Sequence, residues 1–426
     1  MLDIKLLREN FDGVKKNVES RQRECSSIKK FKEIDGEWRN NVTKLQTLNT
    51  QKNKLSDEIG DLYKKNKTDA ANKLKKQVQT IKEEIDTLQG KVNILEDALK
   101  DIMFTIPNLL DKSVPIGKDE DDNIEIKKHL KPTKFNFKPL PHWELGVNLG
   151  LIDFERGIKI SGARMYCMIG DGARLMRALK NFTLDLHISD GYNEVNPPLL
   201  INENIIYGLG KKGFTTEMYQ TLEGQYLSAT EEFPITGMYA NEVIDNINLP
   251  LRLTGGSNSW RKEAGSAGKD VRGILRVHQF NNTELINICE PKDSWKLLEE
   301  MTNQAEKVLK ELDIPYRIVT LCSGDIGLAA SKTYDIEVWT PSNETYREVS
   351  SCSNCLDYQA RGLGIKYKNN KTKEISFVHT LNGTGVSLNR LWIAIVENYQ
   401  QENGDVLIPK ALIKYMNGQK VITKKS

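Results

Sequence analysis

A long run of apolar residues, spaced alternately four and three positions apart, constrains the first quarter of this 426-residue chain. Such spacing averages 3.5 residues and aligns a narrow apolar stripe along a helix, which is typical of a coiled coil. The repeat is unbroken in its second half, at Leu74, Val78, Ile81, Ile85, Leu88, Val92, Leu95, Leu99 and Ile102. The first half keeps the rhythm with two polar interruptions, at Phe31, Ile34, Trp38, Asn41, Leu45, Leu48, Lys52, Leu55, Ile59 and Leu62.

A short polar segment, YKKNKTDAANK at residues 63–73, separates the two halves. A break of this length joins two neighbouring helices most simply as an antiparallel hairpin. Each stripe covers roughly 30 residues, so the hairpin would be at least about 45 Å long at 1.5 Å per residue. The sequence therefore predicts an N-terminal helical arm over residues 1–110, formed mainly by a long antiparallel coiled coil.

Two roles are open for this arm. A coiled coil can serve only as a spacer or a dimerisation element. The expected turn is rich in cations, however, with Lys64, Lys65, Lys67, Lys73, Lys75 and Lys76 against Asp61 and Asp69. Exposed lysines can contact phosphates and add salt-dependent affinity for a nucleic acid without reading its bases. A solvated charged surface without a partner is the other interpretation of the same residues.

The pattern changes after about residue 103, where a proline-containing acidic segment, IPNLLDKSVPIGKDEDDN, begins. Helices are expected at 174–188 and 387–400. Short strands are expected at 226–228, 250–254, 273–280, 284–289, 316–321, 334–339 and 375–379. Because strands and helices do not alternate regularly, the sequence predicts an α+β domain over residues 111–426, with an antiparallel sheet flanked by helices.

The composition indicates where such a protein works. Lys plus Arg number 61 and Asp plus Glu 58, so a polyanionic partner would have to meet local basic patches. The chain has no run of 18 apolar residues, which a membrane-spanning helix would need. Its six cysteines are scattered and suit reduced thiols, at positions 25, 167, 289, 322, 352 and 355. These features predict a cytoplasmic protein with no membrane partner.

Three short motifs suggest ligands that their surroundings do not support. GLGKKG at 208–213 fits the pattern G-x-G-x-x-G, but no convincing helix follows it, as a dinucleotide site requires, so a mobile loop is favoured. GSAGKD at 265–270 resembles a phosphate-binding P-loop yet lacks its first glycine and final Ser or Thr. CSNC at 352–355 would supply half of a zinc site, and the sequence offers no second half. We therefore expect no zinc.

The segment SWRKEAGSAGKDVRGILRVHQF at residues 259–280 concentrates cations around a Gly/Ser/Asp turn. We interpret it as a hairpin with a strand ending near Glu263 and a return strand ILRVHQF. Alternation then places Arg261 and Glu263 on one face, and groups Arg276, His278 and Phe280. Arg261 would hold a phosphate, Glu263 would accept from an exocyclic amine, and Phe280 would stack on a base. A surface hairpin with cross-strand ion pairs is the alternative.

The stretch WRKEAGSAGKDVRGILRVHQFNNTE closely resembles the second signature motif of class II aminoacyl-tRNA synthetases, in its seryl-tRNA synthetase form. GYNEVNPP resembles motif 1 and NGTGVSLNRLWIAIVENYQ resembles motif 3, which places the three motifs at about 174–201, 258–289 and 382–400. LSATEEFPI and REVSSCSNCLDYQARGLGIKY resemble the segments around the amino acid and the metal. SNCLDYQAR and FVHTLNGT look closer to eukaryotic cytosolic enzymes than to bacterial ones.

The resemblance implies ATP-dependent ligation of L-serine to serine tRNA through a seryl-adenylate, with release of AMP and pyrophosphate. It implies ATP and Mg²⁺ as cofactors and a homodimer with motif 1 at the interface. The helical arm would contact the long variable arm of the tRNA, while the acceptor end would reach the catalytic domain. The tRNA-binding candidates in the helical arm are Lys64, Lys65, Lys75 and Lys76.

Roles for single residues follow from the same motifs. The catalytic candidates are Arg261, which would bridge the α-phosphate and the serine carboxylate, Glu348 and Arg390. The ATP-binding candidates are Arg261, Lys262, Glu263, Arg276, Val277, His278, Phe280, Glu348, Val349, Ser350, Ser351 and Arg390. The Mg²⁺ candidates are Glu348 and Ser351. The serine-binding candidates are Thr230, Glu231, Glu232, Arg261, Glu284, Asn382 and Thr384.

Two positions depart from the family pattern. Glu231 stands where related sequences commonly have a small residue, and Thr384 stands where many have serine. Two other functions remain open: a related enzyme that activates a different small amino acid or loads another carrier, and a non-catalytic RNA-binding protein that has kept the fold. The second would be expected to lose its ATP-binding residues, yet the chain has Arg261, Glu263, Glu348 and Arg390.

Overall fold

The computed structural model describes residues 1–263 and 272–424, which belong to two compact units. One unit is Glu24–Ile106, and the other combines Met1–Arg23 with Pro107–Ser426. The sequence placed residues 1–110 together in the helical arm. The structure differs from this division at residues 1–23, which pack with the larger unit.

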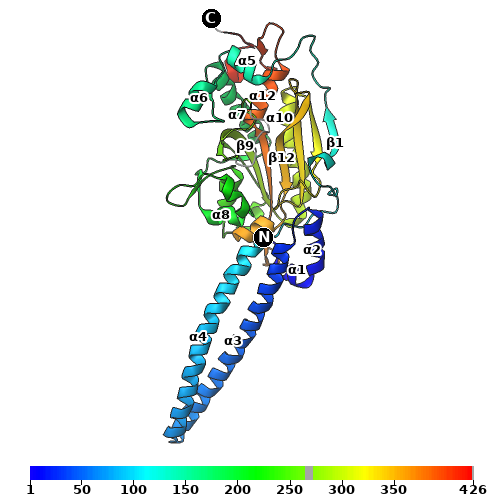
Figure 1. The fold of residues 1–426 in the computed structure, drawn as a ribbon. Coiled ribbons are helices and arrows are strands. Elements are labelled where there is room, and N and C mark those ends of the chain that lie inside the picture. The colour runs from blue at the N-terminus through cyan, green and yellow to red at the C-terminus, as the bar shows by residue number, and fades with distance from the viewer. Residues whose placement is uncertain (264–271, 425–426) are drawn as a thin grey trace. The chain divides into compact units, whose positions relative to one another are not determined.

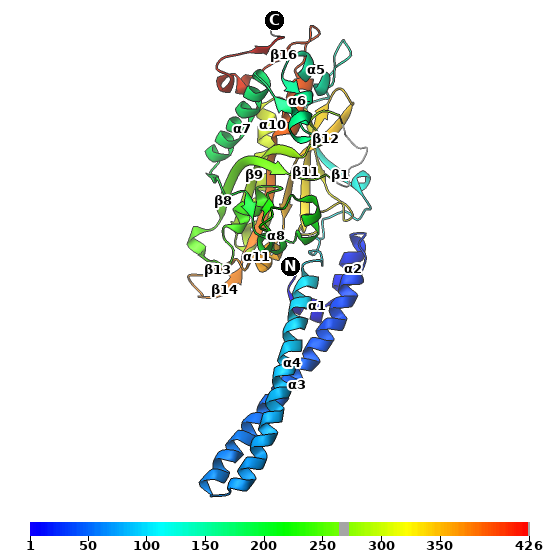
Figure 2. The same cartoon turned by 60° about the vertical axis from the view of Figure 1, so that its left-hand side comes forward.

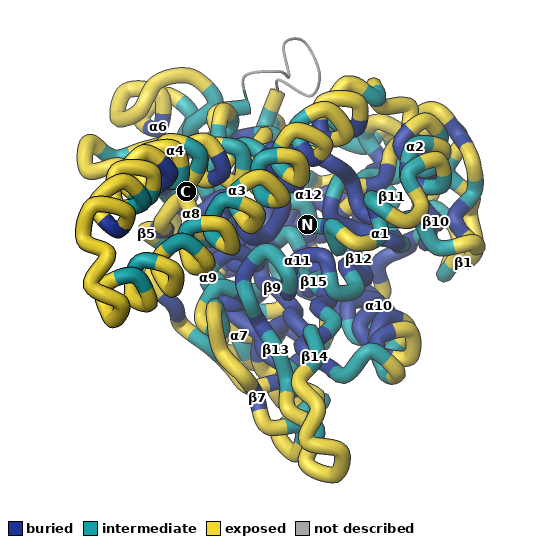
Figure 3. Tube along the Cα trace, turned by 90° about the horizontal axis from the view of Figure 1, so that it is seen from below, coloured by how far each residue is buried: buried dark blue, intermediate teal, exposed yellow. Residues whose placement is uncertain are grey.

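The smaller unit is a pair of long helices, α3 (Ser26–Lys64) and α4 (Thr68–Met103), joined by a turn of three residues (Figure 1). Every position of the two apolar stripes is buried or half-buried, whereas the outer surfaces of both helices are exposed (Figure 3). The 39 residues of α3 correspond to about 58 Å at 1.5 Å per residue. The predicted pair of long helices is confirmed.

The tRNA-binding candidates lie around the turn of this pair. All four side chains, those of Lys64, Lys65, Lys75 and Lys76, are exposed. Lys64 Nζ lies 3.3 Å from Asp61 Oδ1, and Lys75 Nζ lies 5.0 Å from the centroid of the Tyr63 ring. The turn therefore presents several cations together at one end of the hairpin.

Residues 1–23 pack with the larger unit because they bury their own apolar and cationic side chains in it. They form α1 (Ile4–Glu9) and α2 (Phe11–Ser20), whose buried residues include Leu7, Val14 and Val18. The guanidinium of Arg21 is almost completely buried and donates to Gly327 O at 3.1 Å and to Ala330 O at 2.6 Å. Hydrogen bonding to two carbonyls offsets part of the cost of burying that charge.

The larger unit is built on an eight-stranded sheet in the order β1-β10-β11-β12-β15-β9-β8-β4. All neighbouring pairs are antiparallel except β4 with β8. The strands are β1 (Ile124–His129), β4 (Asn193–Glu194), β8 (Leu251–Trp260), β9 (Gln279–Cys289), β10 (Tyr316–Thr320), β11 (Lys332–Thr340), β12 (Thr345–Asn354) and β15 (His379–Ser387). This architecture confirms the predicted α+β class with an antiparallel sheet flanked by helices.

Both faces of the sheet are covered, as strand β9 illustrates. Leu285 points into a core shared with α7 (Asp171–Ser189), α10 (Ser294–Glu311) and α12 (Leu388–Asn398). Ile286 and Ile288 belong to a second core with α8 (Glu203–Gly208), α9 (Glu232–Gly237) and α11 (Tyr358–Leu363). Helix α7 packs along β8 (Figure 2). Helices α7 and α12 match the two that the sequence predicted at 174–188 and 387–400.

Shorter elements complete the larger unit. They include α5 (His142–Asn148), α6 (Phe154–Ser161), β2 (Ile152–Asp153), β3 (Cys167–Met168), β5 (Leu200–Ile201), β6 (Tyr226–Leu227), β7 (Val243–Asp245), β13 (Lys366–Lys368), β14 (Ile375–Phe377), β16 (Val406–Leu407) and β17 (Val421–Ile422). The strand expected at 375–379 is divided between β14 and the start of β15. Among the described helices, none combines the length and apolar character needed to cross a membrane.

The apolar stripe of α4 gives a direct test of the helical pairing. Ile81 lies in the stripe and is 8% exposed, so we expect Ile81→Ala to lower the free energy of unfolding of the hairpin by about 2 kcal/mol through lost packing. Ile94 lies on the same helix but is 70% exposed, so Ile94→Ala should change it by less than about 0.5 kcal/mol. Urea unfolding followed by helical circular dichroism compares the two, and equal effects would contradict the assigned stripe.

Candidate active site

The cationic segment sits at the end of the β8–β9 hairpin. The two strands pair in continuous register from Leu251 with Ile288 to Trp260 with Gln279. One further contact extends the pairing, since Arg261 N donates to His278 O at 3.0 Å. The hairpin predicted from the sequence is therefore present, and most of its proposed loop, residues 264–271, lies outside the described residues.

The predicted return strand at residues 273–280 is wrong over most of its length, because β9 begins only at Gln279. Gly273 has φ of +76°, and Ile274 N donates to His142 Nε2 at 3.1 Å instead of entering the ladder. A Cβ at position 273 would lie 2.0 Å from His142 Nε2. Glycine lets the backbone pass this close to the ring and adopt a left-handed conformation.

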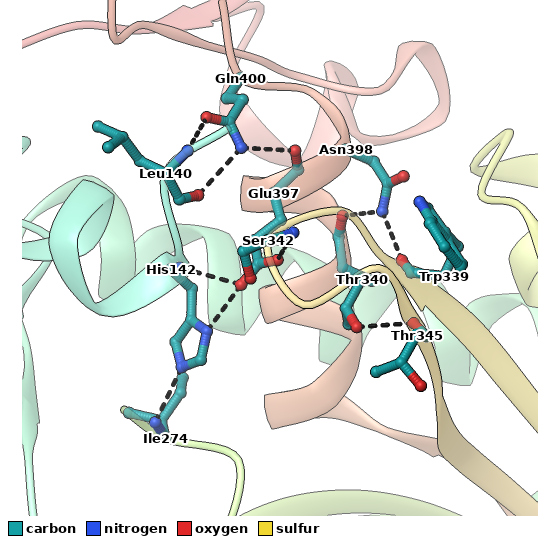
Figure 4. A network of polar contacts seen from close by, with 11 residues as sticks. Leu140, His142, Ile274, Trp339, Thr340, Ser342, Thr345, Glu397, Asn398 and Gln400 are labelled. Carbon is teal, nitrogen blue, oxygen red and sulfur yellow. Dashed lines mark hydrogen bonds and ion pairs between the residues drawn. The ribbon is translucent and has the colours of Figure 1, made fainter. Parts of the chain in front are cut away.

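His142 connects this return segment to helix α12 (Figure 4). Its Nε2 accepts from Ile274, so its Nδ1 carries the proton donated to Glu397 Oε1 at 2.9 Å. The same oxygen accepts from His142 N at 3.0 Å, and Ser342 N donates to Glu397 Oε2 at 3.2 Å. Helix α12 also carries Arg390, so this buried network links two parts of the chain that form the site.

Arg261 directly follows β8 and lies between two aromatic rings. Its guanidinium carbon is 5.1 Å from the centroid of Phe280 and 5.5 Å from that of Phe214. Its Nε donates to Ala229 O at 3.3 Å, and burial lowers the pKa of the guanidinium without removing its charge at neutral pH. The rings and the carbonyl thus hold a cation in a fixed position.

A cavity of about 170 Å³ opens beside Arg261. Eight ATP-binding candidates line it: Arg261, Glu263, Arg276, Val277, Phe280, Glu348, Val349 and Arg390. The lining also includes Leu275, Asn282, Ser387 and Asn389, which the sequence did not suggest. Lys262 and Ser350 are not in the lining: Lys262 N donates to Glu217 O, and the Ser350 hydroxyl donates to Thr384 O. His278 is also outside it, with Nδ1 3.1 Å from Arg261 O.

Two arginines at the wall of this cavity are paired with carboxylates. Arg276 Nε lies 3.0 Å from Glu263 Oε2. Arg390 Nη1 donates to the backbone oxygen of Glu348 at 2.6 Å and lies 3.1 Å from its Oε2. These ion pairs orient both guanidiniums, whose remaining N–H groups can bind an anionic ligand in a forked manner.

A second cavity, of about 460 Å³, adjoins the first and shares Arg261, Glu348 and Thr384 with it. Its lining includes six of the seven serine-binding candidates: Thr230, Glu232, Arg261, Glu284, Asn382 and Thr384. Ser351 also lines this cavity. Two adjoining cavities that share Arg261 can accommodate two ligands whose reacting groups meet beside this cation.

Glu284 lies deep in the second cavity because of the strand register. It pairs with Gly255 on β8 and with Thr384 on β15. Its Oε1 accepts from Thr230 Oγ1 at 3.2 Å and from Thr384 Oγ1 at 3.4 Å. Burial, followed by the charges of Glu232 and Glu231, raises its pKa to about 8. At neutral pH its carboxyl is therefore mostly protonated, and it can both donate to and accept from a ligand hydroxyl.

Glu231 is the serine-binding candidate that the structure does not bring into the cavity. It is 1% exposed, and neither carboxyl oxygen has a hydrogen-bond partner in the described structure. A Cβ at Gly255 would lie 2.8 Å from Glu231 Oε2, so the glycine makes room for this side chain. Burial raises the pKa of Glu231 to about 7, and nearby Ser257 and Lys180 offset part of the rise. The Ser257 hydroxyl itself donates to Asn258 O.

Oxygen donors suited to a divalent cation line the second cavity. Glu348 and Ser351 are both present, and each faces an acid across the β11–β12 pair, Glu337 and Asp335 respectively. Within the described residues, no group of three or more His, Cys, Asp or Glu side chains could hold a metal alone. The oxygen set fits Mg²⁺, which keeps several waters and shares its coordination with substrate phosphates.

The thiols of the CSNC segment have a different setting. Cys352 and Cys355 are both buried, and burial raises the pKa of each to about 12. Zinc binds the thiolate form, which this environment disfavours. Both thiols are therefore protonated at neutral pH in this environment.

Comparison with known proteins matches both parts of the chain. Residues 1–110 match the seryl-tRNA synthetase N-terminal domain, and residues 214–399 match the class II tRNA synthetase core domain (G, H, P, S and T). The serine–tRNA ligase of Macrococcus caseolyticus is 43% identical over 99% of this chain and 100% of its own length. The chain belongs to the seryl-tRNA synthetase family.

Solved structures agree with this assignment. The seryl-tRNA synthetase of Pyrococcus horikoshii in complex with ATP is 37% identical, with a TM-score of 0.94 and full coverage of both chains. The cytoplasmic serine–tRNA ligase of Naegleria fowleri in complex with AMP is 33% identical, with a TM-score of 0.87 over 100% of this chain and 99% of its own. Other curated relatives at 43% identity come from Malacoplasma penetrans and Ureaplasma urealyticum. These curated relatives are bacterial and do not support the expected likeness to eukaryotic cytosolic enzymes.

Several residues of the site were not predicted from the sequence. Lys211 and Phe214 reach the second cavity from the GLGKKG segment and the helix that follows it, η2 (Lys212–Glu217), and Asp335 reaches it from β11. Asn389 in the first cavity donates to Tyr166 Oη at 2.7 Å and accepts from Asn281 N at 3.0 Å. The lysine pair of GLGKKG was the one visible sign that this loop differs from a plain turn.

The buried carboxyl of Glu231 predicts how stability changes with pH. Its folded pKa is raised to about 7 from 4.5, so ionisation favours the unfolded chain and stability falls as pH rises between these values. Glu231→Gln removes this penalty, so the stability of the variant relative to the unmodified protein should rise by about 2.5 kcal/mol from pH 5 to pH 8. Denaturant unfolding at several pH values measures the difference. Glu194→Gln, at a nearby exposed position, should show no such trend; a flat difference for Glu231→Gln would contradict the buried charge.

Proposed function

We propose that the protein activates L-serine with ATP and then transfers the seryl group to serine tRNA, releasing pyrophosphate and AMP. The observation that carries this proposal is the wall common to the two cavities, where Arg261, Glu348 and Thr384 belong to both. A nucleotide in one cavity and an amino acid in the other would meet beside Arg261. Membership of the seryl-tRNA synthetase family supports the same reaction.

In the first step, an oxygen of the serine carboxylate attacks the α-phosphorus of ATP. A new P–O bond forms, and the bond to pyrophosphate breaks. Arg261 would lie beside both anionic groups and reduce their repulsion, while Arg276 and Arg390 would face the outer phosphates. Because these cations are held in place before the reaction, catalysis comes mainly from positioning and electrostatic stabilisation. Mg²⁺, when held by Glu348 and Ser351, would neutralise further phosphate charge.

The amino acid would be recognised by its hydroxyl and its ammonium group. The protonated Glu284, with Thr230 and Thr384 beside it, offers a donor and acceptors to a CH₂OH side chain. Glu232, whose carboxylate is buried, would bind the ammonium. A site that hydrogen-bonds a hydroxyl rejects analogues without it by roughly 10⁴–10⁵, because its own polar groups would be left unpaired. Threonine would be excluded by size.

In the second step, a ribose hydroxyl of the terminal tRNA adenosine attacks the carbonyl carbon of the seryl-adenylate, and AMP leaves. The acceptor end must therefore reach the shared wall. The exposed lysines at the turn of the helical hairpin would contact the long variable arm of the tRNA through its phosphates. The protein would act as a homodimer in the cytoplasm, in keeping with the free thiols.

Replacing Arg261 should separate activation from tRNA binding. We expect Arg261→Ala to lower serine-dependent ATP–pyrophosphate exchange by at least about 100-fold, because a fixed cation at the reacting groups is lost. Affinity for serine tRNA, measured by filter binding, should change by less than about twofold, since phosphate contacts elsewhere supply it.

A matched control is Arg252→Ala, on β8, the strand that Arg261 directly follows. Arg252 Nη2 lies 2.5 Å from Glu300 Oε2 and lines neither cavity, so its loss should leave exchange almost unchanged. Exchange by the unmodified protein is measured with serine, alanine and glycine. Equal exchange with alanine or glycine would rule out the serine assignment, and absence of exchange with any amino acid would favour a non-catalytic RNA-binding protein.

We expect the lysines at the hairpin turn to contribute the salt-dependent part of the affinity for tRNA. Replacing Lys64, Lys65, Lys75 and Lys76 together with Gln should weaken binding of serine tRNA. The slope of log affinity against log salt should fall by about 0.7–0.9 for each phosphate contact that is lost. Binding is measured at several salt concentrations, together with aminoacylation at low tRNA concentration.

A control removes the same charge elsewhere, with Lys368, Lys371, Lys373 and Lys420 changed to Gln. These side chains are exposed on the larger unit, so the slope should change little. If the hairpin variant keeps the full slope and aminoacylates normally, its lysines are only solvated.

A further inference from the structure

The GLGKKG segment does not form the dinucleotide site that its pattern suggested. Instead, its Lys211 lines the amino-acid cavity. Gly210 has φ of +77°, and a Cβ there would lie 2.5 Å from Cε1 of the Tyr358 ring. Lys211 N then donates to Ile206 O at 3.1 Å, which closes the turn after α8. This geometry sets Lys211 in the lining of the second cavity.

Inside the cavity, Lys211 pairs with Glu232. Its Nζ lies 3.6 Å from Glu232 Oε2. The other carboxylate oxygen, Oε1, accepts from Gln359 Nε2 at 2.7 Å, and Gln359 Oε1 accepts from Thr380 Oγ1 at 2.7 Å. Glu232 is therefore held in a fixed orientation by the amide, with one oxygen directed at the lysine.

Charge in the cavity favours this pairing. Among the described residues that line it, the acids are Glu120, Glu232, Glu284, Asp325, Asp335, Glu337 and Glu348, against the cations Lys211 and Arg261. The Glu232 side chain is only 7% exposed, and a buried carboxylate needs a cation or hydrogen bonds to remain charged. Arg261 is held by the Ala229 carbonyl and the Phe280 ring, so among the described residues that line the cavity it is Lys211 that lies within ion-pair distance of Glu232.

We propose that Lys211 occupies the ammonium position of the amino-acid site while the cavity is empty, and that serine must displace it to bind. The inference rests on the proposed function, in which Glu232 binds the serine ammonium. Both cations are primary ammonium groups that compete for the same carboxylate oxygen. The lysine side chain is 34% exposed and has a flexible four-carbon stem, so it can leave toward solvent when the substrate enters. Lys211 thus raises the KM for serine.

The test replaces the charge and keeps the length of the side chain. Lys211→Met should lower the KM for serine in ATP–pyrophosphate exchange by about threefold to fivefold, the range expected for loss of one partly exposed ion pair. The kcat and the KM for ATP should stay within about twofold, because the lysine pairs with neither the reacting groups nor the nucleotide.

Lys212→Met is the matched control, one residue away in the same loop. Lys212 Nζ lies 5.1 Å from the centroid of the Tyr207 ring and outside the cavity lining, so its loss should leave the KM for serine unchanged. A second arm uses 2,3-dihydroxypropanoate, which keeps the carboxylate and the CH₂OH of serine but has no ammonium group. Its inhibition constant should not fall in Lys211→Met, because it does not compete for Glu232.

An unchanged KM for serine in Lys211→Met would overturn the inference. A raised KM would overturn it too and would place the lysine on the serine carboxylate. Equal tightening of serine and 2,3-dihydroxypropanoate would show that the lysine acts on the whole cavity and not on the ammonium position. Absence of serine-dependent exchange in the unmodified protein would instead refute the proposed function itself, and the inference would fall with it.

Discussion

The alternation of side chains along paired antiparallel strands is the constraint on which the site depends. Glu284 on β9 faces Gly255 on β8 and Thr384 on β15, and Asn382 faces Ser353 on β12. Residues paired across a ladder point to the same side of the sheet, so β9, β15 and β12 supply side chains to one cavity. A slip of one residue in any pair would turn its side chains into the opposite core.

This register also explains how the site can hold several carboxyl groups close together. The sheet holds Glu284 away from water, where its carboxyl keeps a proton near neutral pH. Glu232 stays close by, with Gln359 and Lys211 as its partners. Arg261 lies where this cavity meets the first one and lines both. In the proposed function, the ammonium and the hydroxyl of serine would match this distribution of carboxyl groups, and its carboxylate would lie beside Arg261.

The helical repeat of apolar residues predicted this structure more reliably than the alternation along strands. The four-three repeat placed nearly every inward position of α3 and α4, because a helix pair buries whatever its repeat aligns. Local alternation failed at residues 273–278, where a buried contact with His142 replaces strand pairing. It also did not predict that the Phe280 ring lies against Arg261. Glu231 follows Thr230 directly, yet it turns away from the cavity toward Gly255.

The sequence by itself determined the two structural classes, the helices α7 and α12, and nearly half of the residues that line the two cavities. It could do so because helix periodicity and family motifs are local properties of the chain. Only the tertiary structure decided that His142 ties the return segment to α12, that Glu231 is sealed beside a glycine, and that Lys211 meets Glu232. Each of these contacts joins segments distant in sequence or depends on burial, and packing and desolvation have no local signature.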